Sequence, residues 1–290
     1  MSCKWVKCVG VFVLLLSTLC ISSAFGDPNN GGFEDPCDYN STMDSNTPTS
    51  WYFENYVEVV GNFFPHPASG YYTGWKFNEA TGLYPFEGES FIVLSTGDWP
   101  ESSSYSKIWQ TITVGEGETL TGVYFFGTCD YWDYNDFSYI KLIPLRDDLE
   151  HEEIIIAQES LKSVGGDYTS LGGWKRFAYT FDASEAGKYQ LTIFVSDYRD
   201  NAWDSYLAVD AIKLCHNPPE NGELNCDCTV NFEDFAIMVS DWLYDCNDPI
   251  FYNDPNTNCL LGTDLSGNGL VELNDLRIIA ENWLLGIKEE

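Results

Sequence analysis

A twelve-residue segment that occurs twice constrains the fold of this chain more than any other feature. In the copy at 264–275, oxygen-bearing side chains stand at positions one, three, five, nine and twelve, and Gly269 at position six permits a sharp turn. Calcium takes about six to eight oxygen ligands, and alternate residues of a tight loop can supply them. We therefore predict a calcium-binding loop, to which Leu270 contributes its carbonyl, with the ligands Asp264, Ser266, Asn268, Leu270, Glu272 and Asp275.

The second copy begins 41 residues earlier in the chain. It departs from the pattern at position one, where Glu223 replaces an aspartate, and at position six, where Cys228 replaces the glycine. Apolar residues follow both copies at the spacing of one helical face, so each loop is predicted to lead into a helix. The expected ligands of the first loop are Glu223, Asn225, Asp227, Thr229, Asn231 and Asp234. The predicted small all-α domain and its two loop–helix repeats span 217–290, 221–243 and 262–284.

This arrangement resembles the dockerin type I family, whose module consists of two such repeats and ends each calcium loop on Asp. The resemblance covers about the last quarter of the chain, and it implies that calcium orders two helices that dock onto a cohesin module. The Ser-Thr pair of the family at positions ten and eleven is replaced by Phe-Glu and Leu-Asn. We therefore expect a cohesin-like or another surface protein as partner. Trp242 and Trp283 are expected to end the two helices and to pack within the module.

The first 26 residues have the pattern of a secretory signal peptide. Lys4 and Lys7 precede the apolar run from Val9 to Cys20, which is too short to span a membrane, and small residues follow it. We expect an exported protein without a lipid anchor or a membrane span, secreted or associated with the cell surface. The formal net charge of −31 argues against nucleic acid and anionic lipid as partners.

Residues 27–216 read as a succession of short strands. Ile108 and Ile112 alternate with Trp109 and Thr111, turn residues separate the segments, and no segment of helical length intervenes. About nine strands without crossover helices predict an antiparallel β-sandwich, or jelly roll, with one core. The predicted strands are 51–60, 90–95, 107–114, 119–126, 137–145, 153–157, 174–181, 188–195 and 206–214.

The two ends of this domain carry a second resemblance. The segments NGGFEDP at 30–36 and SYLAVDAIKL at 205–214 are similar to the first and last strands of carbohydrate-binding-module-like jelly rolls. In those folds the two strands lie together and often hold a structural calcium ion. The resemblance implies that Glu34 and Asp210 are ligands of such an ion.

A sandwich that binds sugars needs exposed aromatic side chains, because sugar rings stack their CH-rich faces on Trp and Tyr. The segment CDYWDYND at 129–136 offers Tyr131, Trp132 and Tyr134, interleaved with aspartates, and Trp75 is a further candidate. Aromatic residues make up 16% of the chain, so most of them must be buried. Packing or calcium binding is therefore the competing interpretation of this segment.

Seven cysteines lie beyond the signal peptide, and disulfides are expected in an exported protein. Cys37 and Cys215 flank the sandwich and could pair with each other, which leaves one cysteine over. Four more lie in or between the repeats and could form two bridges there in three pairings. A four-thiolate zinc site competes with these bridges, although the spacing lacks the two-residue gaps typical of structural zinc. These four are Cys226, Cys228, Cys246 and Cys259.

No motif points to catalysis. His66, His151 and His216 stand outside any nucleophile elbow or zinc-protease motif. A glycosidase needs only two suitably separated carboxylates, and among 45 acidic residues such a pair can always be found, so its presence decides nothing. We therefore expect a secreted non-catalytic binding or adhesion protein with a calcium-dependent docking tail, linked to polysaccharide utilisation. The alternatives are a polysaccharide-degrading glycoside hydrolase and a structural surface protein whose sandwich is only a spacer.

Overall fold

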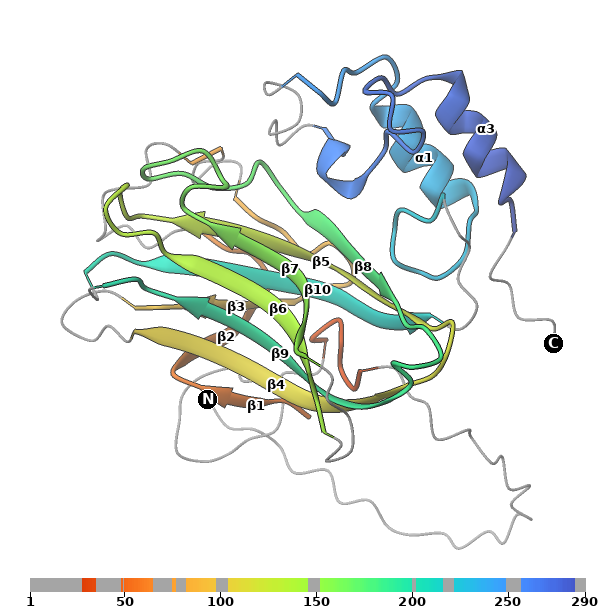
Figure 1. Cartoon of the computed structure of the whole chain (residues 1–290). Coiled ribbons are helices and arrows are strands. Elements are labelled where there is room, and N and C mark those ends of the chain that lie inside the picture. The colour runs from red at the N-terminus through yellow and green to blue at the C-terminus, as the bar shows by residue number, and fades with distance from the viewer. Residues whose placement is uncertain are drawn as a thin grey trace, which may run out of the picture.

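The chain folds into a β-sandwich with two short α-helices packed against it (Figure 1). The computed structural model describes residues 28–34, 48, 50–64, 75–76, 82–97, 104–145, 152–199, 202–215, 222–248 and 257–284. The predicted signal peptide, Cys37 and the three histidines lie outside the described residues. No helix among the residues described has the length and apolarity needed to cross a membrane.

Two five-stranded sheets form the sandwich. The first sheet has the strand order β1-β4-β9-β6-β7 and the second has the order β2-β3-β10-β5-β8. Every described pair is antiparallel, so the predicted antiparallel sandwich is confirmed. The strands are β1 Tyr52–Glu54, β2 Tyr56–Val60, β3 Phe91–Ser95, β4 Tyr105–Val114, β5 Thr119–Thr128, β6 Phe137–Pro144, β7 Ile154–Ser160, β8 Lys175–Thr180, β9 Gly187–Ser196 and β10 Ser205–Cys215.

The predicted strands coincide with observed ones to within a few residues, with one exception. The segment 51–60, predicted as one strand, is split at Asn55 into β1, which pairs with β4, and β2, which pairs with β3. Asn55 has a φ of 65°, and its side-chain amide donates to the carbonyl of Tyr105 at 2.7 Å. This left-handed residue turns the chain from the first sheet to the second, although the strand-like composition continues through it.

Strands β5 and β10 are buried along nearly their whole length, because both faces of the second sheet are covered at its centre. The inner face packs on the first sheet. Trp75 covers part of the outer face and lies over Gly127, where a Cβ atom would come within 2.5 Å of the indole. The Trp75 indole also donates to the carbonyl of Thr128 at 2.9 Å. The suggestion that Trp75 is an exposed sugar platform is therefore wrong.

Both predicted helices form, and each begins at the tenth residue of its loop. Helix α1 spans Phe232–Ser240, helix α3 spans Leu273–Glu281, and a 3-10 turn, η1, spans Cys259–Leu261. Each α-helix starts with a capping box. The side chain of the ninth loop residue caps the helix, and the carboxylate of the twelfth, Asp234 or Asp275, accepts a hydrogen bond from the backbone N–H of the ninth. The loop sequence therefore sets both helix starts.

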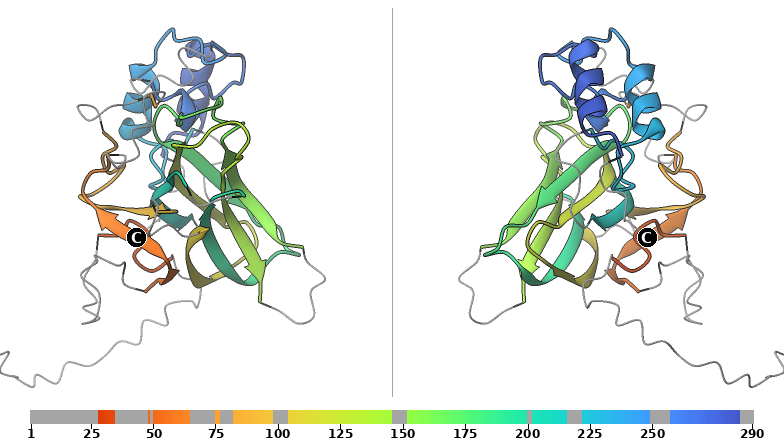
Figure 2. Two further views of the ribbon diagram at one scale, coloured as in Figure 1. Left: turned by 90° about the vertical axis from the view of Figure 1, so that its left-hand side faces the viewer. Right: turned by 90° about the vertical axis from the view of Figure 1, so that its right-hand side faces the viewer.

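The helices lie side by side on a small shared core (Figures 1 and 2). Its fully buried members include Val230 and Val271, the eighth residues of the two loops. The prediction that Trp242 and Trp283 end the helices is wrong, because α1 stops at Ser240 and α3 at Glu281. Both tryptophans occupy the following turns and pack against the core, as expected.

Residues 222–284, named here the C-terminal module, pack on the outer face of the second sheet. Val123 and Ala211 of the sandwich share a buried cluster with Cys226 and Leu261 of the module. The described residues of the module contain two short α-helices and one 3-10 turn, which does not confirm a separate all-α dockerin domain. The predicted domain boundary at residue 216 lies outside the residues described.

The described residues form two disulfides, Cys215–Cys228 and Cys246–Cys259. The predicted pairing of Cys37 with Cys215 is therefore wrong, as is a set of bridges or a zinc site confined to the four cysteines of the repeats. The reason is the docking of the first loop, which brings Cys228 against the last residue of β10. Cys226 faces the sandwich instead, 3.5 Å from the Thr121 hydroxyl, and remains a thiol.

Candidate functional site

Three loops meet at one end of the sandwich: 129–136 after β5, 161–174 after β7 and 197–204 after β9. Hydrogen bonds join them. Tyr168 N donates to the carbonyl of Asp130 at 2.8 Å, and Tyr198 N donates to the Asp136 carboxylate at 2.9 Å. Trp132 N donates to the Asp167 carboxylate at 2.5 Å. We call these three loops the loop cluster.

Aromatic side chains gather on the loop cluster. Trp132 is 58% exposed, and the ammonium of Lys162 lies 5.4 Å from its ring centroid. Tyr131 packs edge to face on Tyr134 at 4.9 Å between ring centroids and lies 6.2 Å from Tyr168. The structure thus brings together the three aromatic residues predicted from the sequence, and only Trp132 among them presents most of its surface to solvent.

Two members of the group were missed in the sequence, Tyr168 and the 43% exposed Tyr198. Each stands beside an aspartate in a turn, a signal too common to identify a site alone. Their placement on the loop cluster depends on the order of the strands in the two sheets, which the sequence pattern does not specify.

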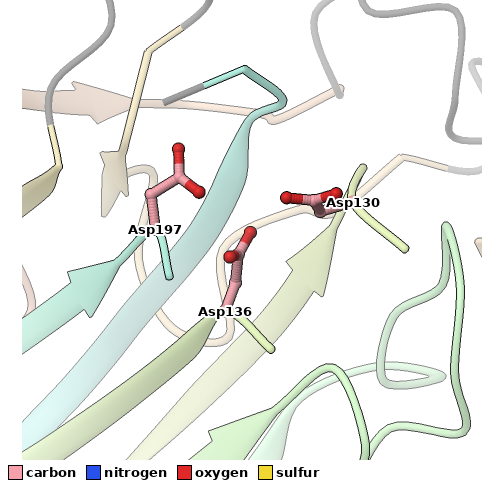
Figure 3. Close-up of side chains that lie close together, drawn as sticks. All are labelled: Asp130, Asp136 and Asp197. Atoms are coloured by element: carbon pink, nitrogen blue, oxygen red, sulfur yellow. The ribbon is translucent and has the colours of Figure 1, made fainter. Parts of the chain in front are cut away.

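Three buried aspartates of the loop cluster, Asp130, Asp136 and Asp197, lie close together (Figure 3). They follow β5, precede β6 and follow β9, and one carboxylate oxygen of each lies within 4.8 Å of the others. Asp136 also accepts a hydrogen bond from the Ser205 hydroxyl at 2.6 Å. Carboxylate oxygens at this separation have the spacing of ligands around a hard cation. The sequence placed the first two in one loop but gave no reason to add Asp197.

The second loop of the C-terminal module brings its six predicted ligand residues into one turn. The Asp264 carboxylate accepts hydrogen bonds from the backbone N–H groups of Asn268 at 3.1 Å and Gly269 at 2.7 Å. The buried Asp275 accepts from Ser266 N at 2.8 Å and Glu272 N at 2.7 Å. The donor set of carboxylates, hydroxyl, amide and carbonyl oxygens fits calcium. None of the described lysines or arginines pairs with Asp264.

The first loop has a different electrostatic environment. Burial raises the pKa of the Glu223 carboxyl, and the Arg176 guanidinium, which forms an ion pair with it, opposes that rise. Burial likewise raises the pKa of Asp234. The thiol of Cys226, enclosed at the contact with the sandwich, has its pKa raised to about 11 by burial. The residues of this loop thus sit in a drier site that already contains a cation.

Glu34 and Asp210 lie on either side of the segment 86–90. Glu34 accepts hydrogen bonds from Glu89 N at 2.9 Å and Ser90 N at 3.0 Å. Asp210 stands at a β-bulge in β10, and accepts from Phe86 N at 2.8 Å and Ala211 N at 2.7 Å. Burial raises the pKa of Asp210 to about 7. Both carboxylates hold backbone amides, and their role as calcium ligands stays a prediction.

A second group of aromatic rings lies on the outer face of the first sheet and was not recognised in the sequence. Tyr139 of β6 stacks on Phe194 of β9 at 4.6 Å and 9° between planes, and Tyr105 of β4 stacks on the other side of Phe194 at 5.6 Å. Tyr52 of β1, 67% exposed, stacks on Trp109. Because their faces cover one another, most of these rings stabilise cross-strand pairs rather than offer a platform.

Comparison with known proteins finds no family model and no curated protein that matches the chain. Among solved structures, the chain is similar to TmCBM61 in complex with β-1,4-galactotriose, at 16% identity and a TM-score of 0.34, over 64% of this chain and 94% of that one. A structure of carbohydrate-binding modules from the β-sandwich superfamily matches at 16% identity and 0.32, over 67% and 64% of the two chains. The K2 cleaved adhesin domain of Lys-gingipain matches at 11% identity and 0.33, over 61% and 94%. At these TM-scores the likeness carries no argument about function.

Proposed function

We propose that this is a secreted, non-catalytic protein that binds polysaccharide through the loop cluster and attaches to a partner through its C-terminal module. The observation that carries the proposal is the exposed indole of Trp132 on the loop cluster, whose hydrogen-bonded loops also carry Tyr131, Tyr134 and Tyr168. An exposed ring of this kind stacks on the CH-rich face of a sugar, while neighbouring carboxylates and hydroxyls accept and donate hydrogen bonds to its hydroxyl groups.

Order in the loops favours binding over a loose surface contact. The backbone N–H groups of Trp132 and Tyr198 donate to Asp167 and Asp136, so the backbone that carries the two aromatic side chains is ordered. A site that is ordered before the ligand arrives loses less conformational entropy on binding. This arrangement supports a binding role and does not require a reacting group.

The test is retention on a panel of neutral and acidic polysaccharides by the protein without residues 1–26. We expect Trp132→Ala to weaken retention on the bound polysaccharide about tenfold, the range for a central aromatic contact. Tyr52→Ala is the matched control, because it removes another exposed aromatic ring from a distant face. Equal retention by Trp132→Ala and the unaltered protein on every polysaccharide would refute the proposed site. Release of reducing ends would instead establish the hydrolase alternative.

Calcium binding by the second loop and docking by the C-terminal module complete the proposal. Phe232 and Leu273, the tenth residues of the two loops, are 73% and 70% exposed. Leu243 and Leu284 follow the two helices and are also exposed, and their N–H groups donate to Val271 and Val230 respectively, each at 2.8 Å.

This near-symmetric set of exposed apolar side chains at the ends of the two helices favours a protein partner over a spacer role, because exposed apolar surface is characteristic of interaction sites. The chemistry of the partner follows from the surface: a matching apolar face, such as that of a cohesin-like module.

A further inference from the structure

The first loop of the C-terminal module uses its position-one carboxylate in a way that a calcium loop cannot. Glu223 Oε2 forms an ion pair with the guanidinium of Arg176, which reaches the loop from β8 of the sandwich. The other oxygen, Oε1, accepts a hydrogen bond from Asp227 N at 2.9 Å. Both oxygens of Glu223 are thus engaged, and the side chain is only 5% exposed.

Arg176 is held in this place by its surroundings. Its side chain is 23% exposed, and its Nε atom is buried without a hydrogen-bond partner among the described residues. A positive group fixed against the first ligand position repels a divalent cation and already neutralises part of the charge of the loop. In the second loop, by contrast, Asp264 accepts hydrogen bonds only from its own loop.

Backbone attachment separates the two loops further. At position six the second loop has Gly269 with a φ of 94°, whereas the first has Cys228, bonded to Cys215 at the end of β10. Position four of the first loop, Cys226, is buried against the sandwich. The first loop is therefore attached to the sandwich at positions four and six, which keeps Glu223 beside Arg176.

We infer that the Arg176 guanidinium takes the place of a metal ion in the first loop, so that the module binds calcium in the second loop alone. The first loop then serves as a fixed joint between module and sandwich. The inference rests on the proposed calcium binding only for the ion in the second loop. The oxygen-bearing residues of the first loop resemble a calcium site in sequence, but the cation that they face is Arg176 of the sandwich instead of a calcium ion.

Asp234→Asn and Asp275→Asn form a matched pair for the test, because both residues are the twelfth of their loops and both return the capping-box hydrogen bond. Bound calcium is counted by equilibrium dialysis of the protein without residues 1–26. We expect Asp275→Asn to bind one ion fewer than the unaltered protein and Asp234→Asn to bind the same number. Loss of an ion from Asp234→Asn would overturn the inference. No loss from Asp275→Asn would overturn the proposed calcium site and the assignment of calcium to the second loop, whereas loss from Asp234→Asn alone would overturn only the replacement of the ion by Arg176.

Arg176→Met supplies the second measurement. Without its partner, Glu223 is a buried charge that a calcium ion can satisfy. We expect this variant to bind one additional ion and to regain in calcium the melting temperature that it loses in chelator. The double variant Arg176→Met with Glu223→Gln should show neither the gain of an ion nor the calcium-dependent recovery. An Arg176→Met variant that melts at the same temperature with and without calcium and gains no ion would contradict the inference.

Discussion

At the scale of single residues, buried aspartates position much of the backbone. Asp136 fixes Tyr198 in the loop cluster, and Asp275 holds two N–H groups of the second loop. Asp241, the residue after α1, accepts from Asn258 N and from the Thr263 hydroxyl, both at 2.7 Å. Hydrogen bonds from backbone N–H groups or hydroxyls take the place of water around each carboxylate, and they allow a charged group to lie in the interior.

Asp241 leads to a prediction about pH. Burial raises the pKa of its carboxyl, so the folded state binds a proton more tightly than the unfolded chain. The resulting stabilisation is present below the ordinary carboxyl range and is lost as pH rises from about 4 through the raised pKa. Asp241→Asn keeps an oxygen acceptor and removes the titration. The difference in free energy of unfolding between variant and unaltered protein should therefore move in favour of the variant as pH rises from 4 to 7.

Urea unfolding at a series of pH values measures this difference. Asp245→Asn is the control, since it removes one negative charge from an exposed position four residues further along the chain. A difference between Asp241→Asn and the unaltered protein that stays constant with pH would show that burial of Asp241 does not perturb its titration.

At the scale of elements, local pattern determined most of what could be predicted. Alternation identified the strands, and the repeated loop identified both helix starts, because these depend on residues close in sequence. The division at Asn55 was missed, since a single left-handed residue hardly changes strand composition. The ion pair of Arg176 with Glu223 and the grouping of Asp197 with Asp130 were missed for another reason: each requires knowing which strand lies beside which loop.

The helices carry the prediction for docking. Phe232 and Leu273 begin α1 and α3 and expose most of their apolar surface. Replacing both with aspartate should abolish capture of a partner from the surface fraction of the producing cell, because charged groups would have to be buried at the contact. Chelator should have the same effect by removing order from the second loop. A pull-down with the protein lacking residues 1–26 measures both effects.

Leu145→Asp provides the control for docking, since it places the same charge on an exposed leucine of the sandwich. Capture that survives the two module substitutions but is lost in Leu145→Asp would place the contact on the sandwich and contradict the docking role of the helices.

At the scale of the whole molecule, two disulfides of equal span have different tasks. Cys215–Cys228 joins the sandwich to the module, and Cys246–Cys259 closes a segment within the module. Both have a sequence separation of 13, so the chain entropy that each removes from the unfolded state is the same, about 3 kcal/mol. If removal of the two disulfides changes the stability of the protein by different amounts, the difference therefore arises in the folded state.

Calorimetry of paired Cys→Ser variants tests this difference. Removing Cys246–Cys259 should lower the melting temperature of the module and leave its attachment to the sandwich intact. Removing Cys215–Cys228 should in addition separate the melting of the module from that of the sandwich into two transitions, because the contacts described between them are then non-covalent: the Arg176–Glu223 ion pair, the Thr121–Cys226 contact and a small apolar cluster. Identical single transitions in both variants would show that the inter-domain bond has no special role.

The bond between Cys215 and Cys228 also defines how tension would pass through the molecule. If one end holds a polysaccharide and the other a partner, pulling on the module loads a covalent bond that ends on β10. That strand lies inside the second sheet, paired with β5 from Ser205 to Cys215 and with β3 from Tyr206 to Val209. Force therefore enters at the end of a strand that pairs with β5 along its whole length, and many hydrogen bonds between β10 and β5 must shear together before the sandwich gives way.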